Sequence, residues 1–497
     1  MVNDLLLLGV DGGSLKIVKE MVEEGELPTF EMLLENGVYG ALESTIPPIT
    51  KPAWPSMFTG LNPASLGAVD HLTLDEKYEE VLKSPDWRGQ FFWDFLNEEG
   101  IKTGIVNPPR VGKVYELNGF MVSGLTEKGD VFPKDFQIDQ NVKPLGEAKS
   151  NSQRISLLLE NLEEKKNILL SLIPKDWNML LFVINETDYV SHFADDWRPV
   201  REVYRKVDEL LSEVLDEIHE CNLLMASDHG IKKIRKRVYV NEMLKQMNLL
   251  RKSEGSAEKL LPKIVELSRK ILGKGFLQTV SNSLPFVKGW EVKSMMSLGN
   301  IDMQNTQMFG YGMRAGSYAR LWINSEEKFT DGIVKKRDVE SVKKKFREKA
   351  TNLDSSEDFI EKIYKGPEVY AGKTERWIPD LIVKLSKDCV EDYKLAGNIA
   401  SDEKGFAHDL HGIFMGYGPD IDSHREVENP KIYDIAPTIL HALETPVPNS
   451  MEGRVLTEIF EKGTEPYTRE IKYRKEIEKE REKVRKEIES LKREGKI

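Results

Sequence analysis

The chain has 497 residues, more than one hydrophobic core usually holds, so we expect a large domain with insertions or several domains. Its 40% hydrophobic and 31% charged residues exclude a disordered chain, and its net charge of −12 argues against non-specific nucleic-acid binding. Two cysteines, Cys221 and Cys389, cannot form a disulfide framework, so we expect a cytoplasmic protein. No apolar run approaches the about 18 residues that a membrane span needs.

The first hundred residues alternate between strand and helix patterns. Residues 5–10 form an apolar run typical of a buried strand, which ends at Asp11-Gly12-Gly13. In open α/β sheets, ligands bind at the carboxyl ends of strands, so Asp11 is a candidate ligand. The alternation predicts an α/β fold with a doubly wound, mostly parallel central sheet flanked by helices. The other elements expected here are helices over 15–24, 30–36, 53–59 and 91–98 and strands over 38–42 and 102–106.

Thr50 lies between two proline-rich turns, after Pro47-Pro48 and before Pro52. The prolines restrict the backbone on both sides, so the hydroxyl is presented on a stiff turn at the start of a short helix. The positive end of a helix suits an anion. Thr50 is therefore either a helix cap or a nucleophile. The two interpretations can be distinguished only by the candidate residues that occur later in the sequence.

Two later strands also end in a carboxylate and an imidazole. After a helix over 151–173, the apolar run 179–184 leads to Asp188 and His192, whose spacing of four places them on one face of a helical turn. After a helix over 200–221, the run 222–226 leads to Asp228-His229.

The second half of the chain predicts four segments. We expect residues 1–242 to form the first part of the catalytic domain and the less periodic residues 243–306 to form an inserted cap. Residues 307–462, which contain His408 and His411, would complete the catalytic domain. Residues 463–497 are rich in Lys, Arg and Glu and predict a charged helix, which would either lie on the body or form a homodimer arm.

The candidate residues at strand ends can be combined into one site. Asp and His without Cys suit Zn²⁺ or Mn²⁺, and their number suits two ions about 4 Å apart. One ion would lower the pKa of a threonine hydroxyl and the other would hold a phosphoryl oxygen, which predicts phosphoryl transfer through a covalent phosphothreonine. The residues are Asp11, Thr50, Asp188, His192, Asp228, His229 and His408.

These motifs, in this order, resemble the alkaline phosphatase superfamily and within it the type I phosphodiesterase/nucleotide pyrophosphatase branch, particularly its prokaryotic members. The likeness extends from about residue 3 to 460. It implies that Asp188, His192 and His408 hold one zinc ion. It implies that a second zinc ion is held by Asp11, Asp228 and His229, with Thr50 bridging as the nucleophile.

Three positions leave alternatives open. His411 follows His408 by three residues and could be the ligand in its place, although we favour His408. The family's phosphate-binding asparagine has no counterpart in residues 67–71, so its role is unfilled or passes to His71. Lys51 would either bind a second charge of the substrate or be solvated, and we favour the solvated interpretation.

The sequence thus predicts a metal-dependent phosphohydrolase that acts on a small phosphate ester or nucleotide-like substrate. A phosphodiesterase is favoured. The alternatives are a phosphomonoesterase of the same superfamily and, from another class, a metal-binding scaffold protein.

Overall fold

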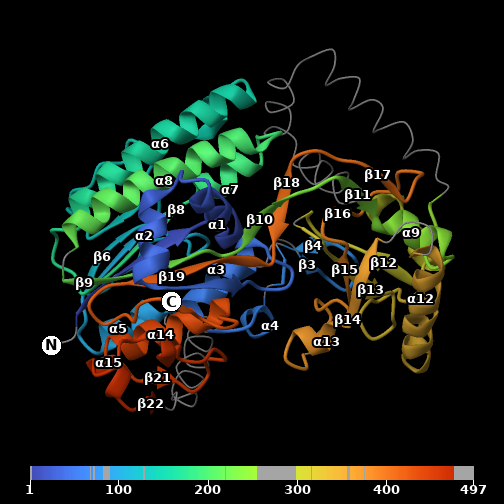
Figure 1. Cartoon of the computed structure of the whole chain (residues 1–497). Helices are drawn as coiled ribbons and strands as arrows, with labels where there is room; N and C mark the ends of the chain where they lie inside the picture. Colours follow the sequence, from blue (N-terminus) through green and yellow to red (C-terminus); the bar gives the residue numbers. More distant parts are fainter. Residues whose placement is uncertain are drawn as a thin grey trace.

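The computed structural model shows two lobes, a larger body and a smaller second lobe (Figure 1). It describes residues 3–67, 69–70, 73–81, 90–126, 129–218, 220–253, 298–314, 316–354, 359–373 and 375–474. His71, most of the expected cap (254–297) and most of the expected C-terminal helix (475–497) lie outside these residues.

The body is built on a nine-stranded sheet in the order β20-β2-β19-β9-β1-β8-β5-β6-β7. Five of its neighbouring pairs are parallel, including β1 with both β8 and β9, whereas β19 is antiparallel to both β2 and β9. The expected α/β fold with a mostly parallel central sheet is therefore confirmed. The strands are β1 (Asp4–Val10), β2 (Val38–Glu43), β5 (Thr103–Val106), β6 (Gly119–Val122), β7 (Val131–Phe132), β8 (Met179–Ile184), β9 (Cys221–Ala226), β19 (His411–Tyr417) and β20 (Arg425–Glu426).

Helices cover both faces of this sheet, as the continuous apolar strands require. Side chains of β1 alternate between two cores: Leu6 and Leu8 lie in one, and Leu5 and Leu7 in the other. On the first face lie α1 (Leu15–Glu23), α2 (Pro28–Asn36), α6 (Asn151–Leu172) and α8 (Trp197–Glu217). On the second lie α3 (Thr50–Thr59), α5 (Phe92–Glu98) and α14 (Ile435–Ala442).

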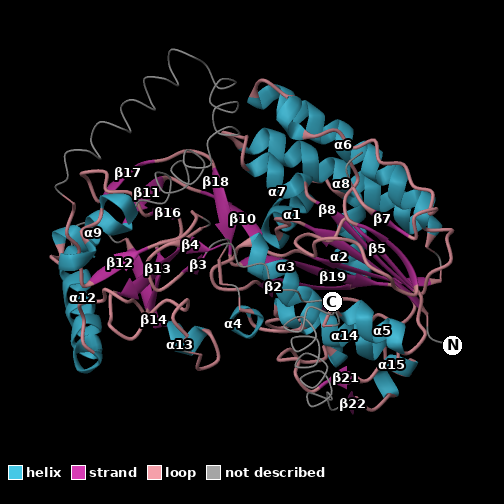
Figure 2. Cartoon of the chain, turned by 180° about the vertical axis from the view of Figure 1, so that it is seen from behind, coloured by secondary structure: helices cyan, strands magenta, loops and turns pink. Residues whose placement is uncertain are grey.

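The second lobe has sheets and a core of its own (Figure 2). One sheet has four antiparallel strands in the order β12-β13-β15-β14, and another has the order β16-β11-β17. The strands are β11 (Lys236–Tyr239), β12 (Met308–Gly310), β13 (Tyr318–Ile323), β14 (Ile360–Lys365), β15 (Leu381–Leu385), β16 (Cys389–Asp392) and β17 (Ala400–Asp402), with helices α9 (Val240–Gln246), α12 (Val339–Asp354) and α13 (Gly366–Val369).

This lobe is longer than the inserted cap that we expected over 243–306. Strands of 236–402 pair with one another and not with the nine-stranded sheet. The segment 307–462 is accordingly divided: its first part belongs to the second lobe, and the return to the body begins at β18 (Phe406–Asp409). The chain leaves the body through β10 (Gly230–Lys233), which pairs with β18 in an antiparallel ladder between the lobes.

A short excursion of the N-terminal half also reaches the second lobe. After α4 (Pro63–Leu66), the strands β3 (Thr73–Leu74) and β4 (Glu80–Val81) form a small hairpin. Between them, the Tyr78 ring stacks on Phe329 with centroids 4.6 Å apart, and its hydroxyl donates to Asn324 at 2.6 Å. The excursion therefore belongs to the packing of that lobe.

The expected charged helix does not begin at 463. Residues 463–474 contain only the short helix α15 (Glu465–Thr468) and β22 (Tyr473–Arg474), which pairs with β21 (Val447–Pro448). Pro466 lies in the first turn of α15, and its carbonyl is held by His441 Nε2 at 2.8 Å, so this segment is folded against the body. No helix in the described part of the chain is long and apolar enough to cross a membrane.

Candidate active site

The candidate residues meet at the carboxyl edge of three adjacent strands. In the parallel register, Val10 of β1 is opposite Ile184 of β8, and Gly9 is opposite Ala226 of β9. The residues that follow the three strands therefore emerge side by side, as open α/β sheets require of their ligand-binding groups. Asp11 follows β1, Asp228 follows β9, and α7 (Glu186–Ser191) follows β8.

One group consists of Asp188, His192 and His408. The first two lie one turn apart, with Asp188 in α7 and His192 at its end, and His192 Nε2 is 3.1 Å from Asp188 Oδ2. His408 comes from β18, and its Nε2 is 3.5 Å from Asp188 Oδ1. These ligand atoms lie within 4.8 Å of one another, close enough to hold one metal ion.

A second group consists of Asp11, Asp228 and His229, all of them buried. His229 Nε2 is 3.3 Å from Asp228 Oδ2 and 3.8 Å from Asp11 Oδ1. The rings of His229 and His408 stack with centroids 3.7 Å apart, so the two groups are neighbours.

Thr50 lies beside the second group. It begins α3, and its Oγ1 is 3.2 Å from His229 Nε2. Ile49, and not Thr50, occupies the cap position before the helix. The Thr50 hydroxyl is therefore not used as a helix cap and instead faces His229.

Backbone carbonyls orient two of the imidazoles. His229 Nδ1 faces the Gly230 carbonyl at 3.1 Å, and His408 Nδ1 faces the Pro48 carbonyl at 2.8 Å. A proton on each Nδ1 leaves Nε2 as the free lone pair that a metal ligand needs. Since Pro48 lies two residues before Thr50, the same contact also ties the turn that carries Thr50 to β18.

The carboxylates have the character of metal ligands. Three of their buried oxygens, Asp11 Oδ1, Asp188 Oδ1 and Asp228 Oδ2, have no hydrogen-bond partner in the described structure. Burying a carboxylate oxygen without a partner is costly, and a divalent cation removes that cost. The residues therefore fit two divalent ions.

The pKa values of these groups reflect their burial and their crowding. Burial, with the nearby charges of Asp228 and Asp188, raises the pKa of Asp11 well above its usual value. Burial and the Asp188 charge raise the pKa of Asp228 to about 8. Burial would raise the pKa of Asp188 as well, but its contacts with His192 and His408 outweigh burial and hold it well below the usual value. Burial also lowers the pKa of His229, which favours the neutral ligand form.

Three polar residues that the sequence analysis missed support Asp11. Asn185 Nδ2 donates to Asp11 Oδ2 at 3.1 Å, and Trp54 Nε1 lies 3.3 Å from the same oxygen. Asn107 donates to Asn185 Oδ1 at 2.9 Å. A signal existed for Asn185, because it directly follows β8 as Asp11 follows β1.

Lys51 corrects one expectation. Its side chain is buried, at 6% exposure, so the solvated interpretation is wrong. Burial and the nearby Arg110 charge lower its pKa, while Asp70 opposes them. The ammonium group of Lys51, the residue after Thr50, is thus held within the protein and feels the charges of both a cation and a carboxylate.

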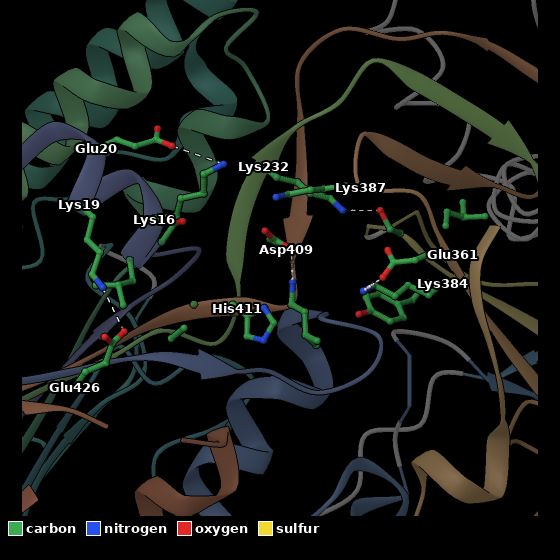
Figure 3. A pocket seen from close by; sticks show the side chains of 18 of the residues that line it. Lys16, Lys19, Glu20, Lys232, Glu361, Lys384, Lys387, Asp409, His411 and Glu426 are labelled. Atoms are coloured by element: carbon green, nitrogen blue, oxygen red, sulfur yellow. Dashed lines mark hydrogen bonds and ion pairs between the residues drawn. The ribbon is translucent and has the colours of Figure 1, made fainter. Parts of the chain in front are cut away.

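His411 does not join either metal-ligand group. It lies at the exposed start of β19, three residues beyond His408. There it lines a separate cavity of about 580 Å³ between the lobes, together with Lys232, Asp409 and Lys384 (Figure 3). His71 lies outside the described residues.

A cleft of about 610 Å³ opens over the two groups. Its lining comes from both lobes: the body supplies Thr50 and the candidate ligands Asp11, Asp188 and His192, and the second lobe supplies Met313 and Arg314. Arg110 and the exposed ring of Tyr189 also line it.

Comparisons with known proteins identify the family. The model of the type I phosphodiesterase/nucleotide pyrophosphatase family matches residues 5–413. No curated protein sequence matches significantly. The fold is similar to that of human ectonucleotide pyrophosphatase/phosphodiesterase 5, with a TM-score of 0.50 at 15% identity, over 92% of this chain and 99% of that one. The murine counterpart gives a TM-score of 0.49 at 15% identity, over 92% and 100% of the two chains.

The family match covers most of the chain, and its range contains all the residues of the two candidate ligand groups. The chain therefore belongs to the type I phosphodiesterase/nucleotide pyrophosphatase family of the alkaline phosphatase superfamily, whose members are hydrolases acting on phosphoric ester bonds.

Proposed function

We propose that the protein is a metal-dependent phosphodiesterase that works through a covalent phosphothreonine at Thr50. The observation that carries the proposal is the arrangement around the Thr50 hydroxyl. Thr50 Oγ1 is 3.2 Å from His229 Nε2, beside two neighbouring groups of imidazoles and carboxylates in which three buried carboxylate oxygens have no hydrogen bond among the described residues.

Two divalent ions fit these residues, and the absence of thiolates with the presence of imidazoles suits Zn²⁺ best, with Mn²⁺ as the alternative. Asp188, His192 and His408 would hold one ion, and Asp11, Asp228 and His229 would hold the other. When bound, such ions supply positive charge that favours an ionised hydroxyl and an anionic phosphoryl group.

The chain's own groups position the reaction. Thr50 Oγ1 releases its proton to solvent and forms a bond to phosphorus while the bond from phosphorus to the leaving oxygen breaks, and that oxygen takes up a proton from solvent. Water then attacks phosphorus, the bond to Thr50 Oγ1 breaks and the hydroxyl is restored. The amino end of α3, where Thr50 lies, adds a favourable dipole for the negative phosphoryl group.

A diester is favoured because the cleft is open and has room for two ester arms beside Thr50. A phosphomonoesterase is the second candidate, because the buried Lys51 lies next to the nucleophile and could compensate a second phosphate charge. The nucleotide pyrophosphatases of the same fold act on nucleotides, and a nucleotide-like substrate is part of the proposal.

The test pairs metal analysis of the purified protein with hydrolysis of bis(p-nitrophenyl) phosphate and p-nitrophenyl phosphate. We expect close to two zinc ions per chain and faster cleavage of the diester. Faster cleavage of the monoester would replace the diesterase with the phosphatase, and bound metal without turnover of any phosphate ester would favour the scaffold protein.

The variant Thr50→Ala tests the nucleophile. It should abolish turnover and leave the metal content unchanged, whereas Thr351→Ala, at an exposed position on α12, should behave as wild type. An active Thr50→Ala protein, or a wild-type protein without metal, would overturn the proposal.

A further inference from the structure

The loop after β5 presents a cation to the cleft that contains Thr50. Arg110 lines this cleft and is exposed, and it forms no hydrogen bond or ion pair with the described residues. An arginine in this cleft that has no partner among the described residues is available to the substrate, and its planar fork suits a phosphate or carboxylate.

The loop that carries Arg110 is firmly held. Asn107 Nδ2 donates to the Val183 carbonyl at 2.8 Å and to Asn185 Oδ1 at 2.9 Å. Val111 packs against the core of the body, and Pro108 and Pro109 restrict the backbone between these anchors.

The backbone of this loop is also strained. Asn107 and Arg110 have φ values of 56° and 67°, a region that residues other than glycine adopt at a cost. Such conformations persist where the surrounding structure enforces them, and they concentrate at ligand-binding sites. Here the conformation places Arg110 at the cleft wall.

The charge of Arg110 affects the pKa values of two residues near Thr50 and the candidate ligands. After burial, it is the main cause of the lowered pKa of Lys51, the residue that follows Thr50. It also opposes the rise in the pKa of Tyr189, which is caused mainly by burial and neighbouring carboxylates. Arg110 and Thr50 line the same cleft, so one substrate can contact both.

The second lobe adds another cation. Arg314 lines the same cleft, and its Nη1 is 3.5 Å from Glu403, a carboxylate that already pairs with Arg237. Arg237 also contacts Asp392 at 3.4 Å, and the Arg314 side chain stays 47% exposed, so Arg314 can contact a substrate in the cleft. The preceding carbonyl, that of Met313, accepts from the buried Arg320, so the loop is fixed in place.

We propose that Arg110, assisted by Arg314, binds a second anionic group of the substrate and makes the enzyme selective for diesters in which an ester arm carries a further phosphate or carboxylate. The inference rests on the proposed function and concerns the same site. It predicts discrimination against diesters with uncharged or cationic arms.

The experiment compares two substrates that share a leaving group: ethyl p-nitrophenyl phosphate and its analogue with a phosphate on the ethyl arm. The readout is the ratio of kcat/KM for the charged substrate to that for the uncharged one. Wild type should favour the charged substrate. Since hydrogen bonds to charged groups contribute about 1.5–3 kcal/mol, Arg110→Ala should lower the ratio about tenfold or more.

Further variants separate recognition from folding. Arg110→Lys should restore part of the ratio, Arg314→Ala should lower it less than Arg110→Ala, and 0.5 M salt should reduce the preference of wild type. Arg198→Ala removes an arginine whose side chain is 86% exposed outside the cleft and should leave the ratio unchanged.

Two results would overturn the inference while the proposed function stands: a wild-type enzyme that cleaves both diesters equally well, or an Arg110→Ala enzyme with the wild-type ratio. Cleavage of neither diester would overturn the proposed function and this inference with it.

Discussion

Asn185 has only one orientation that satisfies its neighbours. Its Oδ1 accepts from Asn107 at 2.9 Å and lies 3.4 Å from the ammonium of Lys165, a buried lysine paired with Glu186. The amide nitrogen must then face Asp11 Oδ2, which leaves Asp11 Oδ1 for a metal ion. Asn185 is thus a positioning residue for the second ligand group.

We therefore expect Asn185→Ala to weaken zinc binding about 10–100-fold, the usual effect of removing a residue that orients a metal ligand. The measurement is competition with a chromophoric chelator, which needs no substrate. Asn36→Ala, at an exposed position of α2, is the matched control. Equal affinities in the two variants would show that Asn185 does not position Asp11.

The sequence predicted the cluster of Asp and His because each residue follows a buried apolar strand, and parallel strands end at one edge. The same signal existed for Asn185 and Asn107, which directly follow β8 and β5, but not for Arg110, which lies further along the loop after β5. The burial of Lys51 could not be predicted from the sequence either. Every residue of α3 from 51 to 59 is buried, so the helix lacks the alternation of polar and apolar faces from which burial is usually inferred.

The turn between β1 and α1 leaves no room for a side chain. Gly12 has a φ of 70°, and a Cβ there would lie 2.9 Å from both Cα and Cβ of Asp188. Its N–H also donates to Asp228 Oδ1 at 3.1 Å. The glycine thus permits close approach of the two ligand groups.

Gly12→Ala should lower both the thermal stability and the zinc affinity, because Asp188 has to move. Gly25→Ala is the matched control: its φ is 75°, but nothing lies within 4 Å of the added Cβ. It should cost only about 1 kcal/mol, the penalty of the left-handed conformation, and keep full zinc affinity. Equal losses of stability with unchanged zinc binding would contradict the steric explanation.

The contact between α14 and α15 should depend on pH. His441 is buried on α14, its Nε2 lies 2.8 Å from the Pro466 carbonyl, and burial, assisted by Arg469, lowers its pKa. The unfolded chain then binds the proton more readily than the folded one, so this contribution to stability is present above about pH 6.5 and is lost as the pH falls.

We expect the free energy of unfolding to decrease less between pH 6.5 and 5 in His441→Gln than in wild type, as measured by urea titration at each pH. His424→Asn, at an exposed position, should keep the wild-type dependence. A His441→Gln profile parallel to that of wild type would show that His441 does not titrate in this range.

Elements with long apolar runs, such as β1, β8 and β9, could be predicted, since a continuous run fits only a strand buried on both faces. The structure of residues 463–474, at the start of the charged tail, could not be predicted in the same way. Its composition favours helix throughout, yet residues 473–474 pair with β21 and the Ile471 side chain packs on the body core, a tertiary effect that local propensity does not contain.

For the whole molecule, the sequence indicated insertion but not its extent. Strands of the second lobe, such as β13 and β15, are as buried as those of the central sheet, and composition does not reveal which strands pair. The lobe also receives the excursion around Tyr78 from far earlier in the chain. Its contribution to the cleft, Met313 and Arg314, depends on how it is joined to the body.

That junction contains a fully buried arginine. Arg320 of β13 pairs with Asp70, which follows α4 of the body, and its Nη2 is 3.4 Å from Glu391 of β16. Its Nε donates to the Tyr393 hydroxyl at 3.1 Å, and Nη2 also donates to the Met313 carbonyl beside Arg314. One side chain thus links the body, the lobe and the cleft wall.

Removing one partner of a buried ion pair leaves the others charged and desolvated, so Arg320→Leu should destabilise the protein by about 3–5 kcal/mol in urea unfolding. Lys336→Ala, which breaks an exposed pair with Glu327, should cost at most about 1 kcal/mol. Replacing Arg320, Asp70 and Glu391 together by Leu, Asn and Gln removes all three charges and should recover part of the loss. The triple variant is also assayed for the ratio of kcat/KM between the charged and the uncharged diester. If stability recovers and this ratio does not, Arg320 acts by holding the Met313–Arg314 wall of the cleft. If neither recovers, the packing of the junction, and not its charge balance, joins the two lobes.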